Sequence, residues 1–242
     1  MTMPSPHAPL TVGMVLFPKL TQLDLAGPYE VFSRMPNTKV HLVAATSAPV
    51  RSEWGLAITP DTTFDQTPPL DIVFVPGGVG ANPMMEDAAL LQFLDSQGRQ
   101  ARYVTAVCTG ALVLGAAGLL RGFRATTHWL SLDLLPFFGA HPVEERVVID
   151  GNRITGGGVT AGIDFGLAVA AEVYGSDVAQ EIQLMIEYNP APPFQSGSPR
   201  TAPADLVQTV RTTRQRIQTE RRAIAERVAV RLQEAKGGTF SS

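Results

Sequence analysis

In Arg102-Tyr-Val-Thr-Ala-Val-Cys-Thr-Gly-Ala-Leu-Val-Leu-Gly-Ala-Ala117, an apolar strand runs directly into an apolar helix, and the turn between them carries Cys108. A sharp turn of this kind holds its first residue at the carboxyl edge of a sheet, beside the amino end of the next helix. Backbone N–H groups and the helix dipole favour an anion there, so the sequence predicts a thiol with a lowered pKa and a reactive thiolate. The alternative is that Cys108 is a buried, inert apolar residue, the more usual role of a lone cysteine.

Strand and helix patterns alternate along most of the chain. This alternation predicts an α/β fold in which a doubly wound, mostly parallel sheet is flanked by helices. Strands are expected at 11–17, 39–45, 71–75 and 102–107, and helices at 23–35, 86–97, 161–174 and 176–188. Further strand signals lie at 123–126 and 141–155, where Asp150-Gly151-Asn152 predicts a hairpin turn.

The length of 242 residues is enough for a single domain with a substantial core. We expect a disordered N-terminal extension at 1–10, an α/β domain at 11–190, an irregular linker at 191–203 and a basic amphipathic helix at 204–236. The linker is expected to be irregular because it is rich in Pro, Ser and Gly.

The C-terminal helix carries most of the positive charge. Eight Lys and Arg residues stand against three Glu between Arg211 and Lys236, whereas the formal net charge of the whole chain is −3. A basic tail can bind nucleic acid. Apolar residues nevertheless form one helical stripe, with no aromatic residues between them: Val210, Ile217, Ile224, Val228 and Leu232. We therefore expect this helix to pack on its own acidic domain or on a partner subunit, and we expect no nucleic-acid binding.

Composition also bears on location and cofactors. A single cysteine cannot form an intrachain disulfide, which favours a reducing compartment, and we expect a cytoplasmic protein. Residues 1–10 hold three prolines and no apolar run, so they are not expected to be a signal peptide. The longest apolar stretch, 111–120, is too short to span a membrane. The chain has no His, Cys and carboxylate set with the spacing of metal ligands, so no metal is expected.

Three segments should meet at the carboxyl ends of the parallel strands, where ligands bind in doubly wound sheets. Asp24 lies in an otherwise apolar stretch after the first strand, and partial burial would raise its pKa and suit it to acid and base roles. The alternative is that Asp24 only caps a helix starting at Leu25. Gly77 and Gly78 follow the 71–75 strand and could donate backbone N–H groups to a ligand, or could simply form a tight turn.

Two more side chains lie near the predicted thiol site. Thr109 offers a hydroxyl next to Cys108, or alternatively a helix cap. His128 is a candidate base for a cysteine–histidine pair; the alternative is that Thr127 caps a helix and His128 only packs nearby. Gly156-Gly157-Gly158 lacks the Lys-Ser/Thr of a nucleotide-binding loop.

Two motifs resemble the ThiJ/PfpI superfamily, which has the class I glutamine-amidotransferase-like fold. They are Phe74-Val-Pro-Gly-Gly78 and Ala106-Val-Cys-Thr-Gly-Ala-Leu-Val-Leu-Gly-Ala-Ala-Gly-Leu-Leu-Arg-Gly-Phe-Arg-Ala-Thr-Thr-His-Trp129. The similarity covers roughly residues 11–190. The strand-to-helix turn that carries Cys108 is called the elbow below. Two subgroups share this version of the elbow: the ligand-sensing half of AraC-type transcription regulators, and the isocyanide hydratases.

Further segments are similar to the isocyanide hydratases: Gln22–Pro28, Gly156–Phe165 and Glu187–Phe194. The chain also stops after one helical tail, which leaves no room for the two helix-turn-helix units of the regulators. The resemblance implies a homodimer without a cofactor that converts an isocyanide and water into an N-substituted formamide through a cysteine thioimidate.

The resemblance also assigns roles. It makes Cys108 the nucleophile, Asp24 the acid and base, and Thr109 a hydroxyl lining the site. Gly77 and Gly78 would be backbone donors, and Val159 would be part of a loop that senses modification of a strained cysteine. His128 is a candidate pocket or auxiliary residue on its local sequence alone.

Other functions of the same thiol stay open. Cys108 could instead serve a redox or ligand sensor, or another thiol enzyme of glyoxalase or hydrolase type. Thr109 stands where some relatives have His, which argues against protease-like or glyoxalase-like activity.

Overall fold

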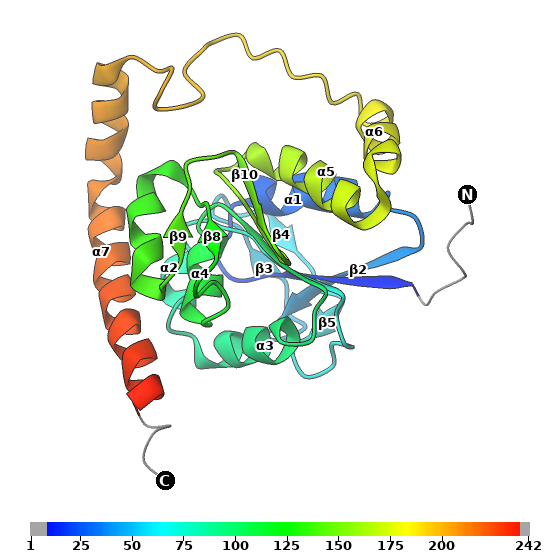
Figure 1. The fold of residues 1–242 in the computed structure, drawn as a ribbon, viewed down its shortest axis with the longest axis horizontal. Helices are drawn as coiled ribbons and strands as arrows, with labels where there is room; N and C mark the ends of the chain where they lie inside the picture. Colours follow the sequence, from blue (N-terminus) through cyan, green and yellow to red (C-terminus); the bar gives the residue numbers. More distant parts are fainter. Residues whose placement is uncertain (1–8, 238–242) are drawn as a thin grey trace.

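The structure is a computed structural model that describes residues 9–237. A seven-stranded sheet forms its centre, with helices on both faces (Figure 1). The strand order is β10-β11-β7-β6-β1-β2-β5, and all neighbours are parallel except β10 and β11. The predicted fold class is confirmed. The strands of this sheet are β1 (Leu10–Val15), β2 (Thr38–Ala44), β5 (Thr62–Thr63), β6 (Ile72–Val75), β7 (Tyr103–Val107), β10 (Val147–Asp150) and β11 (Arg153–Gly156).

Helices cover the sheet on both sides. α1 packs against α5 on one side, whereas α3 lies on the other (Figure 1). All four residues of the central strand β6 are buried, because side chains on both of its faces meet helices. The helices are α1 (Gln22–Phe32), α2 (Ala81–Met84), α3 (Ala88–Gly98), α4 (Gly110–Ala116), α5 (Ala161–Tyr174), α6 (Ser176–Met185), α7 (Ala204–Gly237) and the 3-10 helix η1 (Trp129–Phe138).

Short strands form two small additional sheets. β3 (Val50–Arg51) pairs antiparallel with β4 (Ala57–Ile58), and β8 (Arg124–Ala125) pairs parallel with β9 (His141–Pro142). The strand signals at 141–155 therefore divide among β9, β10 and β11. The predicted hairpin turn joins β10 to β11, and Gly151 adopts the positive φ of 57° that such a turn requires.

Some helix boundaries differ from the predictions. α3 begins at Ala88 rather than at residue 86, because the Asp87 side chain accepts a hydrogen bond from the Leu90 N–H at 2.8 Å and caps the helix. α1 ends at Phe32, three residues before the expected end. Pro36 follows closely, and proline disfavours helical backbone in the residue before it.

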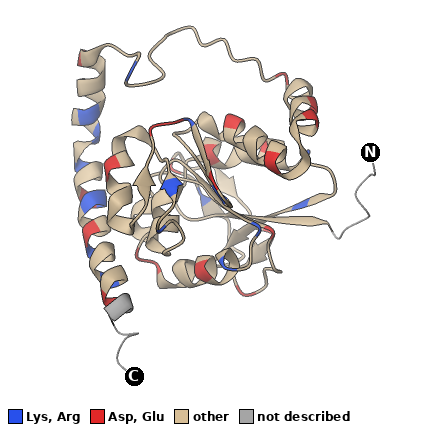
Figure 2. Ribbon diagram, viewed as in Figure 1, with Lys and Arg blue, Asp and Glu red and all other residues tan. Residues whose placement is uncertain are grey.

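The C-terminal helix α7 lies along one side of the molecule, against η1, α2 and α4 (Figure 1). The segment 186–203 leads to it from α6. Figure 2 shows charges of both signs on α7, and two of its arginines form ion pairs with the body: Arg222 with Asp133, and Arg227 with Glu86. Ile224 and Val228 on α7 itself are buried against the body.

Both ends of the chain contain residues outside the described range. The expected N-terminal extension covers residues 1–10, of which 1–8 are not described, and β1 already includes Leu10. Among residues 9–237, no helix is both long and apolar enough to cross a membrane.

Candidate active site

Cys108 occupies the turn between β7 and α4. Its φ is 52°, in the left-handed region that residues other than glycine rarely adopt. The backbone is held there from two sides. The Cys108 N–H donates to the carbonyl oxygens of Gly156 and Gly157, both at 3.0 Å, and the Cys108 carbonyl accepts a hydrogen bond from Thr127 Oγ1 at 2.7 Å. The strain is therefore maintained by hydrogen bonds from neighbouring loops.

Asp24 lies in the first turn of α1 and is fully buried. Its Oδ2 accepts a hydrogen bond from the Gly77 N–H at 3.0 Å. Its Oδ1 has no hydrogen-bond partner within the described part of the chain. The helix begins at Gln22, so Asp24 is not the helix cap that the alternative interpretation proposed.

Gly77 separates the acid from the thiol. A Cβ atom at this position would lie 2.6 Å from the Thr109 nitrogen, 2.7 Å from Cys108 Cβ and 2.8 Å from Asp24 Oδ2. Only glycine allows these three groups to come this close. The structure thus brings together Cys108, Asp24, Thr109 and Gly77 at the carboxyl edge of the sheet, as the sequence predicts.

The thiol pKa differs from the prediction. Burial raises the pKa of Cys108, and the neighbouring Asp24 carboxylate raises it further; a hydrogen bond from the Thr109 backbone opposes both effects without overcoming them. The expectation of a lowered thiol pKa, based on the helix terminus, was therefore wrong. Burial also raises the pKa of Asp24 to about 7, although contacts with Cys108 and Gly77 partly oppose it. The thiol and the acid share one buried environment, so a negative charge on one disfavours a charge on the other.

The backbone donors also differ from the prediction. The Gly77 N–H is already bonded to Asp24, and the Gly78 N–H donates to Thr109 Oγ1 at 3.0 Å. Thr109 Oγ1 also donates to the Gly78 carbonyl at 3.0 Å. Gly77 and Gly78 therefore position side chains of the site, and neither N–H is free to donate to a ligand in this structure.

His128 is the N-cap residue of η1, with its Nδ1 accepting from the Leu130 N–H at 3.3 Å. The predicted cap, Thr127, instead bonds to the Cys108 carbonyl. Burial and, to a smaller extent, the positive charges of Arg221 and Arg214 together lower the pKa of His128 to about 4. The imidazole is therefore neutral near pH 7.

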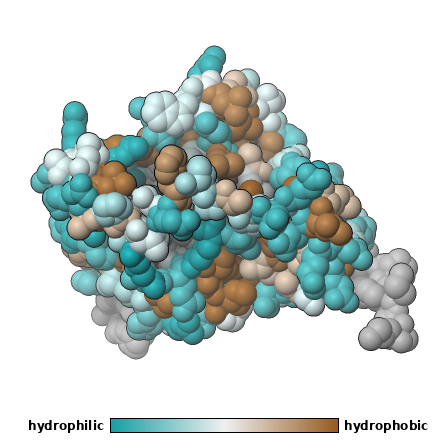
Figure 3. Space-filling view, turned by 90° about the horizontal axis from the view of Figure 1, so that it is seen from above, coloured by the Kyte–Doolittle hydropathy of each residue, from teal (hydrophilic) through white to brown (hydrophobic). Residues whose placement is uncertain are grey.

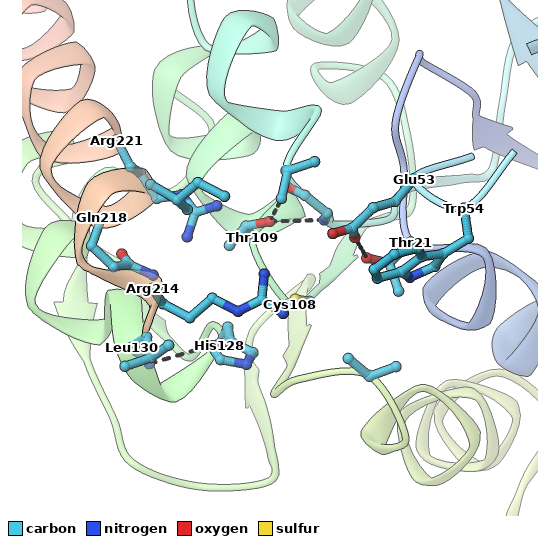
Figure 4. Close-up of a pocket in the computed structure, with 14 residues that line it drawn as sticks. Thr21, Glu53, Trp54, Cys108, Thr109, His128, Leu130, Arg214, Gln218 and Arg221 are labelled. Carbon is cyan, nitrogen blue, oxygen red and sulfur yellow. Dashed lines mark hydrogen bonds between the residues drawn. The ribbon is translucent and has the colours of Figure 1, made fainter. Parts of the chain in front are cut away.

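The site contains a cavity of about 280 Å³ (Figure 4). Cys108, Thr109 and His128 line it together with Val159, whose φ of 22° is also positive. Sequence reasoning missed two of its walls, which Figure 4 shows on opposite sides of the cavity. One consists of Glu53 and Trp54 from the β3–β4 turn, and the other of Arg214, Ile217, Gln218 and Arg221 from α7.

The missed α7 wall carried a readable signal. Arg214, Gln218 and Arg221 are spaced by four and three residues, so they share one helical face with the apolar residue Ile217. Glu53 and Trp54 carried no such signal, because the short connection between β3 and β4 has no periodicity. Among the described residues, no group of three or more His, Cys, Asp or Glu side chains could hold a metal ion.

Comparison with known proteins identifies the family. The sequence model of the DJ-1/PfpI family matches residues 11–172. The chain belongs to the DJ-1/PfpI family. This confirms the resemblance found in the sequence, and the elbow, Asp24 and Gly77 all lie inside the matched region. α7 lies outside it.

Within the DJ-1/PfpI family, the similarity to individual proteins varies in extent. Isonitrile hydratase from Pseudomonas putida is 56% identical over 223 residues, which is 92% of this chain and 98% of that protein. The HTH-type transcriptional regulator GbdR from Pseudomonas aeruginosa is 32% identical over 193 residues, and the chain spans only 52% of that regulator.

A solved structure is similarly close. The crystal structure of a ThiJ/PfpI family protein from Pseudomonas syringae superimposes with a TM-score of 0.88 at 42% identity, covering 93% of this chain and 97% of that one. DJ-1beta from Drosophila melanogaster gives a TM-score of 0.69 at 26% identity and covers 75% of this chain.

Proposed function

We propose that the protein is an isonitrile hydratase, a lyase that adds water to an isocyanide, R–N≡C, and releases the N-substituted formamide, R–NH–CHO. The observation that carries this proposal is the 56% identity to isonitrile hydratase from Pseudomonas putida over nearly the full length of both chains. The site supports it, because Cys108 lines a small cavity and Asp24 is buried beside the thiol.

In the first chemical step, Cys108 and Asp24 act as a pair. The thiol proton passes to Asp24, and the thiolate attacks the terminal carbon of the isocyanide while Asp24 returns that proton to the same carbon. One C–S and one C–H bond form, the N≡C bond becomes N=C, and the product is a covalent thioimidate, R–N=CH–S–Cys. An acid with a pKa of about 7 suits both transfers near neutral pH.

In the second step, water resolves the thioimidate. The Asp24 carboxylate accepts a proton from water as the oxygen adds to the thioimidate carbon, and then passes this proton to the imine nitrogen. The C–S bond of the resulting adduct breaks as its hydroxyl group loses a proton to Asp24, which returns that proton to sulfur as the formamide leaves. Cys108 and Asp24 return to their starting states, so no external oxidant or reductant is needed.

The neighbouring residues position this pair. Gly77 acts through Asp24 by holding Oδ2, and Thr109 acts through Gly78 while lining the cavity. We assign His128 the role of a neutral wall rather than a base, since its pKa lies near 4 and its Nδ1 is bonded to Leu130. Val159 keeps its proposed role in a loop next to the strained cysteine.

We also propose that the enzyme is a cytoplasmic homodimer. Large apolar side chains are exposed at the end of α6 and in the following segment: Leu184 is 80% exposed, Met185 67% and Phe194 78%. Figure 3, which views the molecule from above, shows brown hydrophobic patches among hydrophilic side chains. A second copy of the chain is the proposed cover for these side chains. Analytical ultracentrifugation tests this, and a monomer at micromolar concentration would contradict it.

The function is tested by incubating the purified protein with an aryl isocyanide in water enriched in ¹⁸O. The expected product is the aryl formamide with one ¹⁸O atom, detected by mass spectrometry, formed in proportion to enzyme concentration. Absence of formamide across alkyl and aryl isocyanides would refute the proposal.

A further inference from the structure

Arg221 is a buried cation in the wall of the active-site cavity. Its side chain projects from α7, and the residue is only 4% exposed (Figure 4). Its Nε donates to Asn82 Oδ1 at 2.7 Å, and its Nη1 donates to Ser131 Oγ at 2.9 Å. Both acceptors are neutral. No carboxylate forms an ion pair with Arg221 among residues 9–237.

Two other arginines of α7 have a different environment from Arg221. Arg222 and Arg227 are exposed, and each forms an ion pair with a carboxylate of the body, Asp133 and Glu86 respectively. Surface ion pairs of this kind contribute little to stability. A buried cation without a paired anion is unfavourable, and arginine cannot escape by losing its proton. A negative charge close to Arg221 would therefore stabilise its buried guanidinium.

The charged and titratable groups in and beside the cavity show which anion could lie near Arg221. Glu53 in the β3–β4 turn, Cys108 at the elbow, His128 before η1 and Arg214 on α7 line the cavity. Asp24 on α1 is buried next to Cys108, and Glu220 on α7 interacts electrostatically with Arg221. Glu53 is bonded to Thr21 Oγ1 at 3.3 Å. Cys108 and Asp24 are the buried groups whose charges change during the proposed reaction, and only Cys108 lines the cavity. Arg221 interacts electrostatically with Cys108 more strongly than with Glu220 or Glu53.

We propose that Arg221 is the counter-charge of the Cys108 thiolate, held in place by Asn82 and Ser131. Arg221 is then a positioning residue that acts through Cys108 and does not itself react. The inference rests on the proposed function, in which burial opposes the thiolate that the reaction needs. A fixed cation in the same cavity offsets that opposition whenever the thiol ionises.

The extent of the sequence similarity shows that the helix carrying Arg221 is not confined to this chain. α7 lies outside residues 11–172, which the family model matches. An alignment of 223 out of 242 residues with isonitrile hydratase must nevertheless include part of this 34-residue helix. The helix that supplies Arg221 therefore extends beyond the family core and is shared, at least in part, with the hydratase.

Two variants test the positive charge of Arg221, one by deleting it and the other by neutralising it with a nearby carboxylate. Arg221→Gln deletes it but retains hydrogen-bond donors, and Asn82→Asp places a carboxylate against the Arg221 guanidinium without altering Arg221. Arg221→Lys keeps the positive charge but loses the planar guanidinium group with its several N–H donors. Arg222→Gln is the matched control, because it removes one positive charge from the adjacent, exposed position.

The readout is the pH dependence of Cys108 alkylation by iodoacetamide in the full chain, measured without substrate. We expect the alkylation midpoint to rise by about one pH unit in Arg221→Gln and Asn82→Asp, so that alkylation below the midpoint slows about tenfold. Arg221→Lys and Arg222→Gln should keep the wild-type midpoint. Turnover of a neutral aryl isocyanide should fall about tenfold in kcat for the two charge-removing variants, with little change in KM.

An unchanged midpoint in both charge-removing variants overturns the proposal, as does an equal shift in Arg222→Gln. A purely structural Arg221 would lower the melting temperature and leave the midpoint in place. If Arg221→Gln does not fold, Asn82→Asp alone decides the question. Because alkylation needs no isocyanide, a failure of the proposed function would appear as lack of turnover in the wild type and would leave this result readable.

Discussion

Asp24 and Cys108 approach each other across Gly77, which has no side chain. Asp24 Oδ2 and Cys108 Cβ would both lie within 3 Å of a Cβ atom placed there. Burial raises the pKa of each group. Because the two groups lie this close together, the pKa of each also depends on whether the other is protonated. The reactivity of the site therefore belongs to the pair.

Replacement of Cys108 by Ala should abolish isocyanide turnover, with kcat falling at least about 10⁴-fold, because the reaction would lose its nucleophile. The measurement is formamide formation from an aryl isocyanide, followed by chromatography. The melting temperature should change little and serves as the control for folding. Turnover near the wild-type rate would exclude the thioimidate mechanism.

Asp24→Asn should lower kcat by about 10²–10⁴-fold, as expected for loss of an acid and base. It should also change stability with pH. The pKa of Asp24 is about 7 in the folded protein and near 3.8 when unfolded, so its favourable contribution is complete below pH 3.8 and is lost as the pH rises through 7.

The stability consequence of Asp24→Asn is therefore opposite to its effect on activity. At pH 8 the variant should unfold at higher urea concentration than the wild type, with a gain of at most about 4 kcal/mol. At pH 4 the two proteins should differ much less. Equal stability differences at both pH values would contradict the raised pKa.

Gly77→Ala should disrupt the site more than the fold. The added methyl group would press on Asp24 Oδ2 and on the Cys108 elbow, with a loss of about 1–3 kcal/mol in stability. Because misplaced reacting groups are less effective, we expect kcat to fall about 10²-fold. Gly197→Ala is the matched control, since no atom lies within 4 Å of its new Cβ. Equal activity in the two variants would show that Gly77 has no positioning role.

His128 should contribute to acid sensitivity. Its pKa is lowered from 6.5 to about 4 in the folded protein, so its contribution to stability is complete above pH 6.5 and is lost as the pH falls toward 4. Urea titrations between pH 7 and pH 4.5 should show a smaller loss of stability for His128→Gln than for the wild type, by at most about 3 kcal/mol. A parallel decline in the two proteins would contradict the assignment.

The sequence predicted the elbow and its partners because a parallel sheet brings the carboxyl ends of its strands to one edge. Cys108, Asp24 and Gly77 each follow or lie near the end of a strand, so chain order alone placed them together. The sequence did not predict the direction of the Cys108 pKa shift, since burial depends on how completely the loops close over the thiol.

Two other features also depended on tertiary packing. The N–H groups of Gly77 and Gly78 are bonded to Asp24 and Thr109, and local sequence gives no indication of such partners. The wall that α7 contributes depends on where a distant helix docks after the irregular segment that precedes it. The spacing of its polar residues indicated a face but not the cavity that this face lines.

The docking of α7 has a consequence for how such enzymes can diversify. The residues proposed to break and form bonds lie in the region that the family model matches, whereas one wall of the cavity comes from α7, outside that region. Changes in residues 204–237 other than Arg221 could thus alter which molecules enter the cavity while the chemistry stays intact. The terminal helix is the natural place to engineer new substrate preference without disturbing the strained turn that carries the sulfur.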